Sequence, residues 1–157
     1  SSSERFSITV TGKSGHAARP GEVINPIPVM AELCRRIINV SNDQGDDCNF
    51  ITITQTAAGE RLNIVPGSAI IKGTIRCLDS KKKATLVKAL SSLSNDSSQC
   101  DILVRIDHSS PAIINDVGLK SAAKSAIIHT VGPDGNVGAF PSGVTEFKIT
   151  GLLSTHP

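Results

Sequence analysis

The chain has 157 residues, of which 39% are hydrophobic and 19% are charged, and its formal net charge is +2. This length suits one hydrophobic core, with room for one domain and part of another. The small net charge gives no reason to expect nucleic acid or a membrane as a partner. The chain has four Phe and no Trp or Tyr. This scarcity of aromatic rings argues against an RNA-binding sheet.

The cysteines stand singly, without a C-x-x-C pair, at Cys34, Cys48, Cys77 and Cys100. This spacing argues against a zinc ribbon or a dithiol redox site. Two disulfides are possible, but the cysteines fall in or beside apolar segments, so we expect reduced, partly buried thiols. We find no membrane-spanning run and no signal-peptide core, and we expect a cytoplasmic protein. Because the chain opens directly into a strand without Met, we expect that Ser1 is not the natural start.

The first predicted element is a half-buried strand, because Phe6, Ile8 and Val10 alternate with polar residues. It runs into a loop with the sequence GKSGHAARP at 12–20, whose glycines allow sharp turns and whose proline delays any helix. His16 is therefore presented on a tight loop at a strand end. Imidazole there can hydrogen-bond, protonate or polarise a substrate near neutral pH, although a solvated loop histidine is the alternative.

Two helices and three more strands are predicted after this loop. Apolar residues at three- and four-residue spacing indicate a helix from 26 to about 41, with Asn25 as its cap. A second helix is expected from 80 to about 93, capped by Asp79 or Ser80. Alternation and β-branched residues predict strands at 50–56, 69–77 and 101–106.

The resulting βαββαβ order predicts an α+β, ferredoxin-like sandwich over residues 4–108, with four antiparallel strands and two helices on one face. Asn115 and Asp116 can cap a third helix, and residues 132–157 show no clear periodicity. We therefore expect one domain at 4–108 and a separate segment with an irregular tail at 109–157. The fold alone does not determine an activity.

Three polar residues fall where strands and turns could bring them together. His16 ends the first strand, Asn63 lies in the long turn before the third strand, and Arg76 lies on that strand's polar face. Arg suits a carboxylate, and Asn can bind an amide or acyl oxygen. With His they could hold an acylated amino acid and stabilise a developing oxyanion. Arg76 could instead be a solvated sheet residue.

Four motifs carry a resemblance to a known family: GKSGHAARP at 12–20, NPI at 25–27, LNIVP at 62–66 and KGTIR at 72–76. In order and spacing they resemble the lid of the M20 metallopeptidases. The amidohydrolase branch, with hippurate hydrolases and hydrolases of auxin–amino acid conjugates, is the most similar. The resemblance covers residues 4 to about 108, and more loosely 109–131. It implies a lid, or dimerisation domain, inserted in a catalytic domain that binds two zinc ions.

The resemblance also implies roles for single residues. The residue matching His16 reaches across a homodimer into the partner's active site and stabilises the tetrahedral transition state. The residue matching Asn63 helps to bind the substrate, and the one matching Arg76 binds the substrate carboxylate.

The chain departs from the family pattern at several positions. The H-x-D motif and the Glu-Glu pair of the zinc site are absent, so the chain alone should bind no zinc and be inactive. Gly21 replaces a common histidine, and Thr145-Glu146-Phe147 stands where the family has E-D-F. His156 resembles the last zinc ligand of the family, but it follows Phe147 too closely, so we treat it as a solvent-exposed terminal residue.

We therefore expect a fragment of a zinc-dependent amidohydrolase or peptidase that acts on N-acyl amino acids or small peptides. It would supply the dimer interface and residues that act in the partner's site. Two alternatives remain open: a non-catalytic dimerisation module, and a ferredoxin-like regulatory domain that binds a small metabolite.

Overall fold

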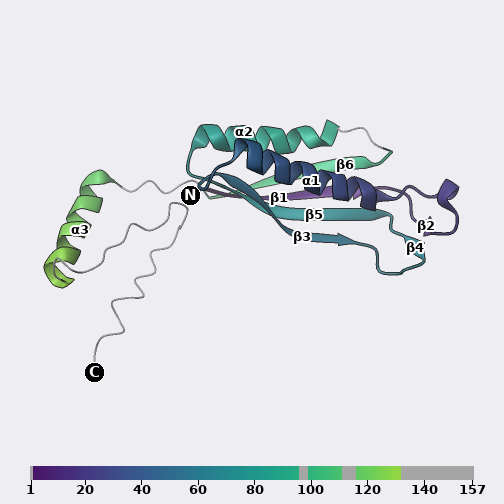
Figure 1. Ribbon diagram of the computed structural model, residues 1–157, viewed down its shortest axis with the longest axis horizontal. Helices are drawn as coiled ribbons and strands as arrows, with labels where there is room; N and C mark the ends of the chain where they lie inside the picture. The colour runs from purple at the N-terminus through teal and green to yellow at the C-terminus, as the bar shows by residue number, and fades with distance from the viewer. Residues whose placement is uncertain (1, 96–98, 111–115, 132–157) are drawn as a thin grey trace, which may run out of the picture.

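The computed structural model describes residues 2–95, 99–110 and 116–131 (Figure 1). It contains a four-stranded antiparallel sheet of order β3-β5-β1-β6. The strands are β1 (Ser2–Thr11), β3 (Phe50–Ala58), β5 (Ser68–Cys77) and β6 (Asp101–Ser110). The helices α1 (Pro26–Gln44) and α2 (Ser80–Ser92) cover one face of this sheet. The predicted α+β, ferredoxin-like fold is thus confirmed.

Four short elements and one further helix complete the described structure. They are β2 (Gly15–His16), the 3-10 turn η1 (Pro20–Glu22), β4 (Ile64–Val65), the 3-10 turn η2 (Leu93–Asn95) and α3 (Val117–Val131). The predicted cap of α3 is confirmed, because Asp116 Oδ1 accepts a hydrogen bond from Leu119 N at 3.0 Å. The predicted irregular tail, with His156, lies outside the described residues.

The hydrophobic core lies between the sheet and the two covering helices. Its largest members come from alternate strand positions and from one stripe of each helix: Phe6, Ile8, Val10, Leu33, Ile37, Ile71, Ile75, Leu86 and Leu90. Burial of each large side chain contributes about 1.5–3 kcal/mol relative to leaving it exposed. The alternation that predicted the first strand is therefore confirmed.

The first strand begins at Ser2, four positions before its first large apolar residue, because polar groups on its core face have partners. The Ser2 hydroxyl donates to the carbonyl of Cys77 at 3.0 Å. Glu4 is only 1% exposed, and its carboxylate forms an ion pair with Lys83 of α2. A charge buried in this way is tolerated only when it is paired.

Asn49 is a second buried polar residue at the same end of the sheet. Its Oδ1 accepts hydrogen bonds from Leu78 N at 3.0 Å and Asp79 N at 3.1 Å, and its Nδ2 donates to Asp46 Oδ1 at 2.8 Å. Asp79 in turn caps α2, accepting from Lys81 N at 2.6 Å. The structure thus selects Asp79 over Ser80 as the cap, and Asn49 joins the end of β5 to the start of this helix.

The register of the strands defines two ends of the sheet. Ser2 pairs with Cys77 at one end, which we term the base, and Thr11 pairs with Ser68 at the other, which we term the tip. A strand of 10 residues at about 3.3 Å per residue separates base and tip by about 30 Å. Strand β6 ends at the base, where Ser110 pairs with Ser3. Figure 1 shows the N-terminus at the base, and β2 and β4 at the tip.

All four cysteines are free thiols, as expected. Cys77 and Cys100 are buried, whereas Cys34 and Cys48 are half-buried. Burial raises the pKa of the thiols of Cys34, Cys77 and Cys100 above the ordinary value of 9.0. No helix among the described residues is both long and apolar enough to cross a membrane.

Candidate functional site

Two loops are tied together at the tip of the sheet, and they carry His16 and Asn63. The short strands β2 and β4 pair His16 with Ile64. Ala17 N donates to the carbonyl of Asn63 at 2.9 Å, and Ser14 Oγ donates to the carbonyl of Val65 at the same distance. Sequence patterns did not predict this two-residue ladder, because elements so short leave no periodicity to read.

Two glycines of the loop at 12–20 are required by close packing. A Cβ at Gly15 would lie 2.5 Å from Cγ1 of Val23, and one at Gly12 would overlap the carbonyl of Ile24. Among the described residues only Gly59 has a positive φ, of 69°. The sequence therefore located the turn correctly, and the structure adds that Gly12 and Gly15 are needed for close approach of the backbone.

The side chain of His16 is exposed, and one of its nitrogens is engaged. Its Nδ1 accepts a hydrogen bond from the backbone N–H of Ala18 at 3.1 Å. The neutral imidazole therefore carries its proton on Nε2, which is left as a donor toward solvent. A fixed N–H donor of this kind is suited to stabilise negative charge that develops on a carbonyl oxygen.

The side chain of Asn63 is also exposed, while its backbone carbonyl holds the His16 loop. The turn that contains Asn63 is closed by a hydrogen bond from Ile64 N to the carbonyl of Arg61 at 3.3 Å. The prediction that His16 and Asn63 lie together is therefore confirmed. Backbone hydrogen bonds of their loops hold both residues in place, whereas their side chains are not buried.

Arg76 lies elsewhere, at the base. It is half-buried near the end of β5, and its cross-strand neighbours are Ser3 and Phe50. The expectation that Arg76 joins His16 and Asn63 within one chain is therefore wrong. The reason is the direction of β5, which starts at the tip with Ser68 and carries Arg76 about 26 Å away from it.

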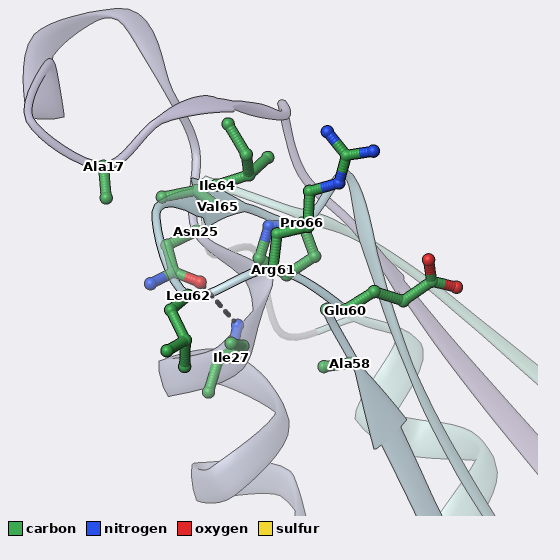
Figure 2. Close-up of a pocket in the computed structure, with 11 residues that line it drawn as sticks. Ala17, Asn25, Ile27, Ala58, Glu60, Arg61, Leu62, Ile64, Val65 and Pro66 are labelled. Carbon is green, nitrogen blue, oxygen red and sulfur yellow. Dashed lines mark hydrogen bonds between the residues drawn. The ribbon is translucent and has the colours of Figure 1, made fainter.

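An open pocket lies beside the tip (Figure 2). Its volume is about 390 Å³, and it is lined by Ala17, Asn25, Ile27, Ala58, Gly59, Glu60, Arg61, Leu62, Ile64, Val65 and Pro66. The side chain of Asn25 is occupied there, because its Oδ1 accepts from Ile27 N at 3.0 Å and caps α1 as predicted. Sequence reasoning missed this pocket, although the apolar Leu62 within a turn was a signal for it.

Within residues 2–95, 99–110 and 116–131, no three His, Cys, Asp or Glu side chains are grouped as metal ligands. His129 is exposed on α3, and the side chain of His108 lies outside the described part. The described residues do not fit a dizinc centre, so we derive no catalytic step through a metal from them.

The family model of the M20 peptidase dimerisation domain matches residues 2–98. The chain belongs to this family. The match covers the sheet strands β1, β3 and β5, both covering helices and the tip with His16 and Asn63.

Curated relatives and solved structures that are similar to the chain include the following three proteins. An N-acyl-L-amino acid amidohydrolase of Geobacillus stearothermophilus is 31% identical over 85 residues, which cover 53% of the chain and 23% of the relative. An Arabidopsis thaliana protein, IAA-amino acid hydrolase ILR1-like 5, is 26% identical over 153 residues, covering 92% of the chain and 35% of the relative. A Staphylococcus aureus tripeptidase structure shares the fold, with a TM-score of 0.67, 24% identity, and coverage of 83% and 35%. The chain thus spans about a quarter to a third of these proteins.

Proposed function

We propose that this chain is the dimerisation lid, with part of the returning catalytic segment, of a zinc-dependent enzyme that hydrolyses amide bonds in N-acyl amino acids or small peptides. The relatives named as an N-acyl-L-amino acid amidohydrolase and an IAA-amino acid hydrolase support this substrate class. The sequence predicts the boundary between the two parts between residues 108 and 109, within two residues of the end of β6 at Ser110.

The observation that carries the proposal is the separation of His16 from the base. The start of β1 and the end of β6 both lie at the base, so segments that precede or follow the sheet join it there. His16 and Asn63 lie at the other end, about 30 Å away along a strand of 10 residues. We infer that these two residues act in the active site of a partner subunit. Arg76, at the base, binds the substrate carboxylate in the site of its own subunit.

The edges of the sheet favour one surface for homodimerisation. Strand β3, with the sequence FITITQTAA, is an edge strand without a charged residue. The other edge strand, β6, carries Asp101, Arg105 and Asp107, and such charges discourage edge-to-edge pairing. Helix α1 packs beside β3 and exposes 52% of Ile38. A two-fold pairing of β3 edges would bury this surface and continue the sheet across two subunits.

In the whole protein, two zinc ions bound by segments outside this chain would supply the nucleophilic hydroxide. This chain's residues would bind and orient the substrate and donate a hydrogen bond from His16 Nε2 to the developing oxyanion. The free thiols fit a reducing compartment, so we keep the cytoplasm as the proposed location.

The proposal is tested with the full-length protein and its His16→Ala variant on N-acyl amino acids. Loss of one oxyanion donor costs about 10²–10³-fold in kcat, while the exposed position predicts an unchanged melting temperature. His129→Ala is the matched control, because His129 is an exposed histidine on α3. A kcat of His16→Ala within a few-fold of wild type would contradict the role of His16. A full-length dimer that hydrolyses nothing would support the non-catalytic module instead.

A further inference from the structure

The pocket beside the tip is lined mostly by apolar side chains that remain open to solvent. Leu62 is fully exposed and Ile27 is 38% exposed, and both line it together with Ile64 and Pro66. Leu62 precedes Asn63 in the chain, and Ile64 pairs with His16 in the short ladder. The pocket is therefore continuous with the candidate site rather than a separate feature.

Three polar side chains, those of Asn25, Glu60 and Arg61, line this pocket together with its apolar ones. The side-chain oxygen of Asn25 is engaged by the first turn of α1. Figure 2 shows the carboxylate of Glu60 and the guanidinium of Arg61 pointing away from Leu62 and Ile27. A volume of about 390 Å³ falls within the ordinary range for small-molecule sites, about 300–1,000 Å³. The apolar side chains of the pocket outnumber the polar ones, which favours an apolar group as the ligand.

The pocket is also held in shape before any ligand arrives. Gly59, with its φ of 69°, turns the chain after the end of β3, and a Cβ built there would lie 3.7 Å from Cγ of Pro66. Backbone hydrogen bonds between the loops at 12–20 and 62–67 fix the opposite wall, with Gly12 N to the carbonyl of Gly67 at 2.9 Å. A preformed wall lowers the ordering cost of binding.

We propose that this pocket binds the apolar acyl group of the substrate, and that Leu62 and Ile27 determine acyl-chain specificity. This inference rests on the proposed function. There, His16 and Asn63 contact the scissile carbonyl, and Arg76 of the other subunit holds the carboxylate of the amino acid. The group next to the His16 and Asn63 loops is then the acyl side, because the amino-acid side points toward the base of the partner subunit.

The first test uses this chain itself and needs no hydrolysis. The methyl resonances of a ¹³C-labelled chain are followed by NMR during titration with N-acetylglycine and with N-octanoylglycine. We expect saturable shifts at Leu62, Ile27 and Ile64 with the octanoyl compound and none with the acetyl compound. Equal responses to both, no response, or shifts that follow protein concentration instead of ligand would overturn the proposal.

The second test measures kcat/KM of the full-length protein over N-acylglycines from acetyl to octanoyl. Burial of one methylene corresponds to about a three- to fourfold gain, so kcat/KM should rise by about that factor per carbon. This increase of kcat/KM with acyl-chain length should become smaller in Leu62→Ala. It should persist in Leu103→Ala, which is the control because Leu103 is an exposed leucine of β6. The same dependence in Leu62→Ala and wild type would overturn the inference while leaving the proposed function intact. If no substrate is hydrolysed, the proposed function fails, and the NMR titration still decides whether the pocket binds an apolar acyl group.

Discussion

The tip and the base of the sheet are built in opposite ways. At the tip, the side chains of His16 and Asn63 are exposed, and backbone hydrogen bonds between loops hold them in place. At the base, the polar side chains of Glu4 and Asn49 are themselves buried and paired. The difference indicates that the tip side chains are free for binding, whereas those of the base maintain the fold. Changes at the tip should therefore alter activity, and changes at the base should alter stability.

Of the substitutions that distinguish the tip from the base, Gly15→Ala should have the largest effect. The added methyl group would lie 2.5 Å from Val23 and force the His16 loop to shift. Because a displacement of about 1 Å can cost up to about 10²-fold in rate, we expect kcat of the full-length protein to fall about 10–100-fold with little change in melting temperature.

Gly21→Ala is the control for that change, since a Cβ at Gly21 meets no atom within 4 Å. Its kcat should equal that of wild type. A Gly15→Ala protein with normal kcat would show that the close packing of this loop does not position His16.

Asn49→Ala should destabilise the base by about 2 kcal/mol, because two backbone N–H groups lose their shared acceptor. At the tip, Asn25→Ala removes only an exposed helix cap and should cost about 1 kcal/mol. Urea unfolding of this chain measures both free energies of unfolding. A cost for Asn25→Ala equal to or above that of Asn49→Ala would contradict the division between tip and base.

The smallest predicted effect is a loss of stability at alkaline pH. Burial raises the pKa of the thiols of Cys77 and Cys100, so the folded state favours their neutral form. Their contribution is fully present below the unfolded pKa, near 9.0, and is lost as the pH rises through the higher folded pKa. The free energy of unfolding should therefore decline above about pH 9.

The Cys77→Ala variant is the control for this decline. Its free energy of unfolding should fall less steeply between about pH 8.5 and 10.5 than that of wild type. Equal slopes would show that burial of this thiol is not linked to stability.

Sequence patterns predicted the sheet and helices well because their signals are periodic and local. The caps Asn25 and Asp79, and the alternation of Phe6, Ile8 and Val10, all have the predicted place in the structure. Buried Glu4 could not be predicted, because a charge in the core depends on Lys83, far along the chain. From the local sequence alone a Glu is expected to be exposed, because Glu is almost never fully buried unless it is paired.

The candidate site was predicted in part, for a related reason. The motifs located His16 and Asn63, and the structure brings them together through the ladder between β2 and β4. The strand that carries Arg76 was predicted correctly, but the expectation that Arg76 lies beside them was wrong, because its distance from them depends on the direction and register of β5 in the sheet. Those are long-range properties that strand periodicity does not contain.

The most direct test of the account is complementation between His16→Ala and Arg76→Ala subunits. Each full-length variant should be inactive alone, and the two are co-expressed with different tags so that the mixed dimer can be purified. If His16 serves the partner's site and Arg76 serves its own, one of the two sites in the mixed dimer holds both native residues. The account then predicts about half of the wild-type activity for a symmetric dimer. A mixed dimer as inactive as its parents would contradict it, because His16 and Arg76 would then serve the same subunit's site.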